Sequence, residues 1–198
     1  VQEADQVIAL LESLNIKDVT LIETSGGVWG AVNAALRRSD LITCVVADSF
    51  DGELFVGDLP NINRGVSHGN KQLAARQFYQ WCQSDNWETL VNQDTEALLR
   101  RIDLGLRRST FKYFKGTIVL ITSGKDAMLH SDIIEEYEKI IYEHPPVKMI
   151  IFPTGKHPSL LSNAVAASTA IKEFLTVVNK GVNLSLYTSD AADEGLGV

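Results

Sequence analysis

Four unbroken apolar runs, each separated from the next by segments with helical periodicity, most constrain the fold of this 198-residue chain. The runs cover residues 19–22, 42–47, 117–122 and 147–152. A run without polar alternation predicts a strand that is buried on both faces, and such strands are typical of parallel sheets covered by helices on each side. The pattern therefore predicts an α/β protein with three layers, helix, sheet and helix, and a mostly parallel sheet.

The segments around these runs carry apolar residues three and four positions apart, which predicts amphipathic helices. The first helix is expected to end near Asn15, and the second is closed by Arg37 and Arg38, whose charges suit a helix C-terminus. The expected apolar faces are Ala4, Val7, Ile8, Leu11 and Leu14; Val28, Val32, Ala35 and Leu36; Ile133, Ile134, Tyr137, Ile140 and Ile141; and Leu161, Val165, Ile171, Phe174, Leu175 and Val178.

The alternation is interrupted between the second and third runs. Gly, Pro, Asn and Asp punctuate the chain as far as Asn70, and helical stripes without a clear strand follow. We therefore predict that residues 48–108 form a small helical cap, inserted into a core made of residues 1–47 and 109–180. Residues 181–198 lack periodicity and are predicted to be a non-native or disordered tail without function.

Composition excludes several classes of partner. The formal net charge is −7, from 18 basic and 25 acidic residues, which disfavours nucleic acid and anionic membrane surfaces as partners.

The acidic, amphipathic opening segment is predicted to be neither a signal peptide nor a membrane span. Cys44 and Cys82 lack metal or redox spacing, so we predict a reducing, cytoplasmic location and no metal or cofactor. The sequence does not predict an oligomeric state.

Residues 18–33, DVTLIETSGGVWGAVN, combine a β-branched strand, a Thr-Ser-Gly-Gly turn and an apolar helix. Gly26 and Gly27 permit backbone angles or close approaches that a Cβ would forbid. The chain is therefore expected to turn sharply at Ser25, which presents its hydroxyl at the carboxyl end of a strand, beside the first amides of a helix. A serine nucleophile is displayed in this way.

Three chemically useful side chains each follow a different strand of the predicted sheet. Ser25 follows the first run, Asp126 follows the third, and His157 follows the fourth. The carboxyl ends of parallel strands meet at one edge, so these side chains can converge there, with His157 as base and Asp126 orienting its ring. Each residue alone is typical of an ordinary turn, and the hypothesis depends on their joint placement. Asp48, directly after the second run, is an alternative acid.

The motifs at these positions resemble those of the α/β-hydrolase family over roughly residues 5–179. That family has a small-x-Ser-x-small elbow, which reads ETSGG at residues 23–27. The order of elements, with a cap between the nucleophile half and the acid strand, is similar as well. The resemblance implies the second half of that fold.

The same resemblance implies a site and an activity. Ser25 would be the nucleophile, Asp126 in GKDAML the acid, and His157 in GKHP the base, with the amide of Gly26 as one oxyanion donor. The implied protein is a serine hydrolase of a small-molecule ester or related acyl substrate, working through an acyl-enzyme and without a cofactor.

Two departures from that family bear on activity. Glu23 stands where the elbow normally has a small residue, so it is expected to crowd the turn or to add negative charge. The early strands, which lie upstream of the elbow, have no counterpart here, so we expect a chain truncated at its N-terminus with Ile22 on an exposed apolar edge. Trp81 and Trp87 in the cap are candidates for an acyl pocket, although aromatic residues at helical spacing are also typical of a core.

Two other functions fit parts of the sequence. The segment SGGVWG nearly matches the dinucleotide motif GxGxxG, and Asp48 stands where a ribose-binding acid would lie, but the motif's first Gly is Ser25. This alternative leaves Asp126 and His157 unexplained. A catalytically inactive hydrolase-like fragment or binding domain is the other alternative, and Glu23 favours it.

Overall fold

The computed structural model describes residues 2–50, 52, 73–103, 113–143 and 147–179. The predicted tail and part of the predicted cap lie outside these residues. The division of the chain into core and cap remains a prediction.

The described strands form one parallel sheet in the order β1-β2-β3-β4, which confirms the predicted fold class. The strands are β1 (Val19–Thr24), β2 (Ile42–Asp48), β3 (Thr117–Ser123) and β4 (Val147–Phe152). The helices are α1 (Gln2–Leu14), α2 (Gly27–Arg37), α4 (Leu73–Gln83), α5 (Trp87–Asp103), α6 (Ile133–Glu143), α7 (Ser159–Ser162) and α8 (Ala164–Asn179), with a 3₁₀ turn, η2 (Ser84–Asn86). The predicted last helix is divided into α7 and α8 at Asn163, whose side-chain amide donates to the carbonyl of Thr154 at 3.1 Å.

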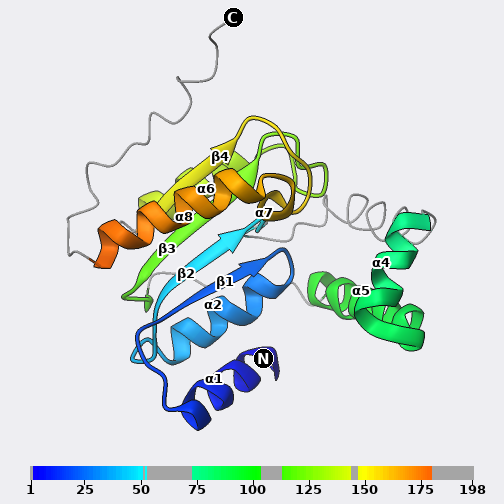
Figure 1. Cartoon of the computed structure of the whole chain (residues 1–198), viewed down its shortest axis with the longest axis horizontal. Helices are drawn as coiled ribbons and strands as arrows, with labels where there is room; N and C mark the ends of the chain where they lie inside the picture. The colour runs from blue at the N-terminus through cyan, green and yellow to red at the C-terminus, as the bar shows by residue number, and fades with distance from the viewer. Residues whose placement is uncertain (1, 51, 53–72, 104–112, 144–146, 180–198) are drawn as a thin grey trace, which may run out of the picture.

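Alternate residues of the central strands pack into two separate cores, which defines the three layers. On one face, Ile118 and Leu120 of β3 pack in a core with residues of α1, α2 and α6. On the other face, Val119 and Ile121 join Ile171 and Phe174 of α8. Figure 1 shows α8 crossing the sheet on the face toward the viewer. Both faces of β2 and β3 are therefore buried, which explains their unbroken apolar runs.

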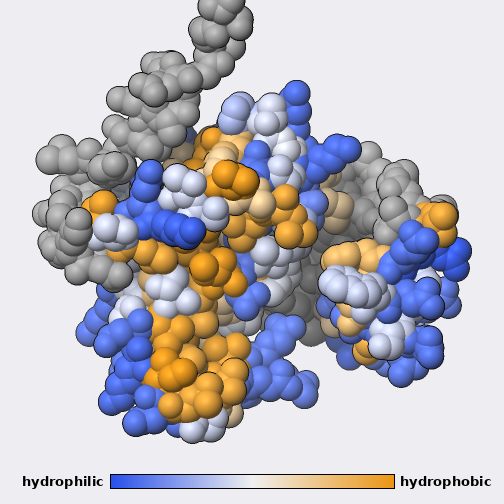
Figure 2. All heavy atoms as spheres, in the orientation of Figure 1, coloured by the Kyte–Doolittle hydropathy of each residue, from blue (hydrophilic) through white to orange (hydrophobic). Residues whose placement is uncertain are grey.

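Strand β1 is an edge of the described sheet. Ile22 is 49% exposed there, together with Leu14 and Ile16 at the end of α1 and just beyond it. Figure 2 shows apolar surface over β1 and its neighbouring helices. The expected apolar edge is thus present in the described part of the chain.

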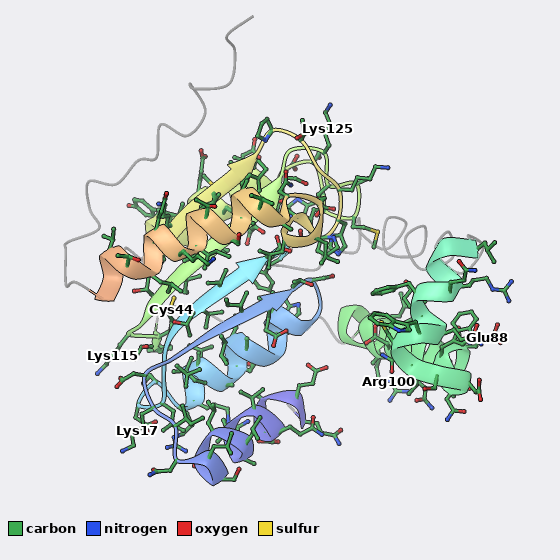
Figure 3. All side chains as sticks on the ribbon, viewed as in Figure 1. Lys17, Cys44, Glu88, Arg100, Lys115 and Lys125 are labelled. Carbon is green, nitrogen blue, oxygen red and sulfur yellow. The ribbon has the colours of Figure 1, made fainter. Side chains whose placement is uncertain are left out.

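The helices α4 and α5 form a pair with η2 between them. Trp87 is 9% exposed and stacks on Tyr79, with ring centroids 6.1 Å apart, and the guanidinium of Arg76 lies over its ring. Figure 1 shows this pair beyond the carboxyl ends of the strands, and Figure 3 shows Glu88 and Arg100 on its surface. Trp87 therefore packs inside the helical pair.

Tyr137 of α6 fixes the chain just after β2. Its hydroxyl donates to the carbonyl of Phe50 at 2.6 Å and accepts from the amide of Phe50 at 3.1 Å, and all these groups are buried. We expect Tyr137→Phe to lower the free energy of unfolding by about 1–3 kcal/mol, because two buried backbone groups lose a partner. Urea denaturation measures this loss, with Tyr142→Phe on the exposed face of α6 as the control.

Candidate active site

Ser25 adopts a left-handed backbone conformation at the end of β1, with φ of +52°. A non-glycine residue in this region is uncommon and marks a sharp, constrained turn. The amide of Ser25 donates to the carbonyl of Asp48 at 2.8 Å, which holds the turn against the end of β2. The strain therefore lies on Ser25 itself, whereas Gly26 has a helical φ of −57°.

The side chains of Ser25, His157 and Asp126 form a continuous chain of contacts at the carboxyl edge of the sheet. The Ser25 Oγ lies 2.8 Å from the His157 Nε2, and the His157 Nδ1 lies 2.9 Å and 3.1 Å from the two carboxylate oxygens of Asp126. The Asp126 side chain is 1% exposed and the His157 side chain 18% exposed. Residues 132 positions apart are thus in hydrogen-bond distance, with the imidazole accessible from one side.

Local hydrogen bonds set the position of Asp126. Its amide donates to the carbonyl of Ser123 at 3.1 Å, and its Oδ1 accepts from the amide of Met128 at 3.0 Å. The amide of Gly124 donates to the carbonyl of Phe152 at 2.8 Å, which ties the loop after β3 to the end of β4. The loop that carries the acid is therefore held against the strand that precedes the histidine. Figure 3 shows Lys125, adjacent to Asp126, extending outward.

Asp48, the alternative acid, points elsewhere. Its carboxylate is fully buried and accepts from the hydroxyl of Ser159 and from the amide of Leu160 at 3.1 Å. Of the two candidate acids, Asp126 is the one whose carboxylate contacts the His157 ring.

The first amides of α2 are directed toward the same edge of the sheet. The amides of Val28 and Trp29 donate to the carbonyls of Ser25 and Gly26 at 3.2 Å and 3.3 Å. The amides of Gly26 and Gly27 come before them, and the first amides of a helix have no acceptor within the helix. A Cβ at Gly26 would meet nothing within 4 Å, so the space at the Cα of this residue is open.

Glu23 lies against the start of α2. A Cβ built on Gly27 would lie 2.8 Å from the Glu23 Oε2, so the absent Cβ makes room for the glutamate. Burial, and secondarily the carboxylate of Glu3, raise the pKa of Glu23 above its ordinary value. The expected crowding is thus accommodated by Gly27, and a carboxyl group lies near the helix start.

Glu23 and Gly27 should therefore depend on each other. We expect Gly27→Ala to lower the free energy of unfolding by about 0.5–1.5 kcal/mol, because the new methyl group displaces the far end of the flexible Glu23 side chain from its preferred rotamer. In Glu23→Gly the same change should cost less, and a double-mutant cycle by urea denaturation measures the difference. Equal losses in both backgrounds would show that the overlap is relieved without cost.

The raised pKa of Glu23 also predicts a pH dependence of stability. As pH rises above 4.5, the unfolded state loses this proton first, so the contribution of Glu23 to stability is present in acid and is lost as pH passes the folded-state pKa. We expect Glu23→Gln to gain stability relative to the unsubstituted protein between pH 4 and pH 7. Thermal unfolding across that range is the measurement, and a parallel pH dependence in both proteins would contradict it.

The two tryptophans proposed for an acyl pocket differ in their surroundings. Trp87 is buried against Tyr79 and Arg76 of its own helical pair, and Trp81 is 82% exposed. Their role in substrate binding stays a prediction.

Ser49 and Ser159 are buried polar residues beside the site that sequence reasoning missed. Small hydroxyl residues next to loops are too common to single out, and only the hydrogen bonds of Asp48 draw attention to them.

Within the residues that the structure describes, no group of three or more His, Cys, Asp or Glu side chains is arranged to hold a metal ion. No helix among them has both the length and the apolar character needed to cross a bilayer. Cys44 lies within the sheet (Figure 3), and burial raises the pKa of its thiol to about 11.

A parallel sheet with serine, histidine and aspartate meeting at its carboxyl edge is the arrangement of the α/β-hydrolase class. Solved structures with the same fold include NosK from Streptomyces actuosus, with a TM-score of 0.72 and 16% identity, over 88% of this chain and 75% of that chain. The chain therefore has the α/β-hydrolase fold.

Two further solved structures are hydrolases. E-2-(acetamidomethylene)succinate hydrolase matches with a TM-score of 0.63 and 18% identity, over 87% of this chain and 72% of its own. A serine hydrolase involved in carbazole degradation, CarC, matches with a TM-score of 0.64 and 16% identity, over 88% of this chain and 71% of that chain. No protein-family model matches the sequence, and no curated protein matches it significantly. The likeness is therefore one of fold.

Proposed function

We propose that this chain is a serine hydrolase of an ester or related acyl compound. The observation that carries the proposal is the contact chain from the Ser25 Oγ through the imidazole of His157 to the carboxylate of Asp126, at 2.8 Å and 2.9 Å. The strained backbone of Ser25 and the open space at the Cα of Gly26 support it further. The proposed substrate is a small acyl molecule, and the proposed location is the cytoplasm.

The proposed reaction has two halves. The Ser25 hydroxyl attacks the carbonyl carbon while the His157 Nε2 takes its proton, and the amide of Gly26 donates to the developing oxyanion. The imidazolium, held by Asp126, then protonates the leaving alcohol as the carbonyl re-forms. In the second half, water attacks the acyl-enzyme with His157 again as base, and the acid product leaves with Ser25 regenerated.

A catalytically inactive, hydrolase-like binding domain is the second candidate. One observation favours it: the half-buried carboxyl group of Glu23 lies against Gly27, near the place where negative charge would develop. A negative charge there opposes an oxyanion. The dinucleotide-binding alternative finds no support in the described sheet, because its strand order has no switch point of the kind at which such cofactors bind.

Fluorophosphonate labelling separates the two candidates. We expect the probe to modify the protein stoichiometrically, with the adduct located on Ser25 by peptide mass spectrometry, together with turnover of p-nitrophenyl acetate. Ser13→Ala, on the exposed surface of α1, is the matched control and should label normally. A folded protein that neither labels nor turns over the ester would favour the inactive domain.

A further inference from the structure

A fully buried polar group lies between the end of β2 and the start of α7. It consists of Asp48, Ser49 and Ser159, which are 0%, 1% and 0% exposed, and we call it the Asp48 cluster. Burying a carboxylate is costly unless its oxygens are hydrogen-bonded, and the Asp48 oxygens have donors from α7 and from Ser49. The proposed reaction steps use none of these side chains.

Both carboxylate oxygens of Asp48 accept hydrogen bonds. The Oδ1 accepts from the hydroxyl of Ser159 and, at 3.4 Å, from that of Ser49, and the Oδ2 accepts from the amide of Leu160 at 3.1 Å. The amide of Ser159 in turn donates to the Ser49 Oγ at 2.9 Å. Three donors of α7 are thus bound to the end of β2.

The same two residues hold the other parts of the site through their backbones. The carbonyl of Asp48 accepts from the amide of Ser25 at 2.8 Å, and the amide of Ser49 donates to the carbonyl of Ile121 in β3 at 2.8 Å. Ser159 and Leu160 follow His157 by only two and three residues. The Asp48 cluster therefore connects the serine turn, the acid-bearing strand and the segment that carries the histidine.

We propose that Asp48 is a positioning residue, which fixes the distance between His157 and Ser25 by anchoring α7 with its carboxylate. This inference rests on the proposed hydrolase function for its catalytic consequence. It differs from the role of the acid, because Asp48 acts on the backbone after His157 and Asp126 acts on the ring.

The charge of Asp48 also faces the site. Burial raises the pKa of its carboxyl group, while the bonds from Ser159 and Leu160 and the nearby imidazole of His157 lower it, and Asp126 raises it. His157 and Asp126 are therefore the ionisable groups that face it. The carboxylate of Asp48 therefore lies close enough to the imidazole to interact with it electrostatically.

The test is Asp48→Asn, with Asp94→Asn on the exposed surface of α5 as a control of equal charge change. Ser159 and Leu160 donate to different carboxylate oxygens, and the amide replaces one of these oxygens with an NH2 group, so α7 loses one anchor. We expect kcat for p-nitrophenyl acetate and the rate of fluorophosphonate labelling to fall about tenfold to a hundredfold, with KM nearly unchanged. A merely structural role would reduce the folded fraction, and with it the extent of labelling, without slowing the labelling of the folded protein.

A second readout does not depend on turnover. The ring resonances of His157, followed by NMR, should shift in Asp48→Asn and stay in place in Asp94→Asn. Unchanged resonances and labelling rates in folded Asp48→Asn would overturn the positioning role. A wild-type protein that never labels, but whose His157 resonances respond to Asp48→Asn, would overturn the hydrolase proposal alone. If Asp48→Asn does not fold, Ser159→Ala removes a single donor and should give a smaller decrease of the same kind.

Discussion

Ser25→Ala should lower kcat for p-nitrophenyl acetate by roughly 10⁴-fold or more, to the rate that binding and oxyanion stabilisation alone provide. The Ser25 Oγ is the atom 2.8 Å from the His157 Nε2, and alanine has nothing to deliver to the carbonyl carbon. The change removes one oxygen, so the fold should be retained apart from the contacts of that hydroxyl. Steady-state hydrolysis with the purified variant is the measurement.

A comparison of Ser25→Ala, His157→Ala and the double variant tests whether the serine and the histidine act together. His157→Ala should be nearly as damaging as Ser25→Ala, and the double variant should be no worse than either, because the residues act as one unit. Ser13→Ala again serves as the control. Independent, additive losses would mean that Ser25 and His157 do not share a step.

Asp126→Asn is the second large effect that we expect, a decrease in kcat of roughly 10³- to 10⁴-fold with KM little changed. An amide can donate its own proton to the His157 Nδ1, which favours the tautomer whose Nε2 carries hydrogen and cannot accept from Ser25. The amide also leaves the imidazolium without a compensating charge. Steady-state kinetics of the purified variant measure the effect.

The control for this variant is Asp94→Asn on α5, with circular dichroism to confirm that all variants are folded. Asp48→Asn provides the contrast. If Asp126→Asn keeps most of the activity while Asp48→Asn abolishes it, the acid is Asp48 and the assignment to Asp126 is wrong.

The strands could be predicted because a strand that is buried on both faces has a continuous run of apolar residues. Val46 and Val119 lie in one core while Val45 and Ile118 lie in the other, so no polar alternation is possible in β2 and β3. The break at Asn163 could not be predicted, because the apolar spacing continues across it. It depends on a hydrogen bond to Thr154, a distant loop residue.

The convergence of Ser25, Asp126 and His157 was predictable, because a polar side chain just after a buried strand must lie at the carboxyl edge of the sheet. Their catalytic roles stay a prediction. Of the two reasons predicted for the glycines, the close approach occurs at Gly27, which makes room for Glu23, whereas the left-handed conformation falls on Ser25. Such a pairing between a strand and the following helix has no local signature.

By itself, the sequence determined the layered parallel architecture and which side chains reach one edge of the sheet, since both follow from periodicity and chain order. Only the tertiary structure decided which aspartate meets the histidine. Asp48 and Asp126 both follow apolar strands, but Asp48 ends its strand facing α7, whereas Asp126 lies on a loop that carries its carboxylate to the ring. That difference is one of direction in space, which the spacing of residues along a chain does not encode.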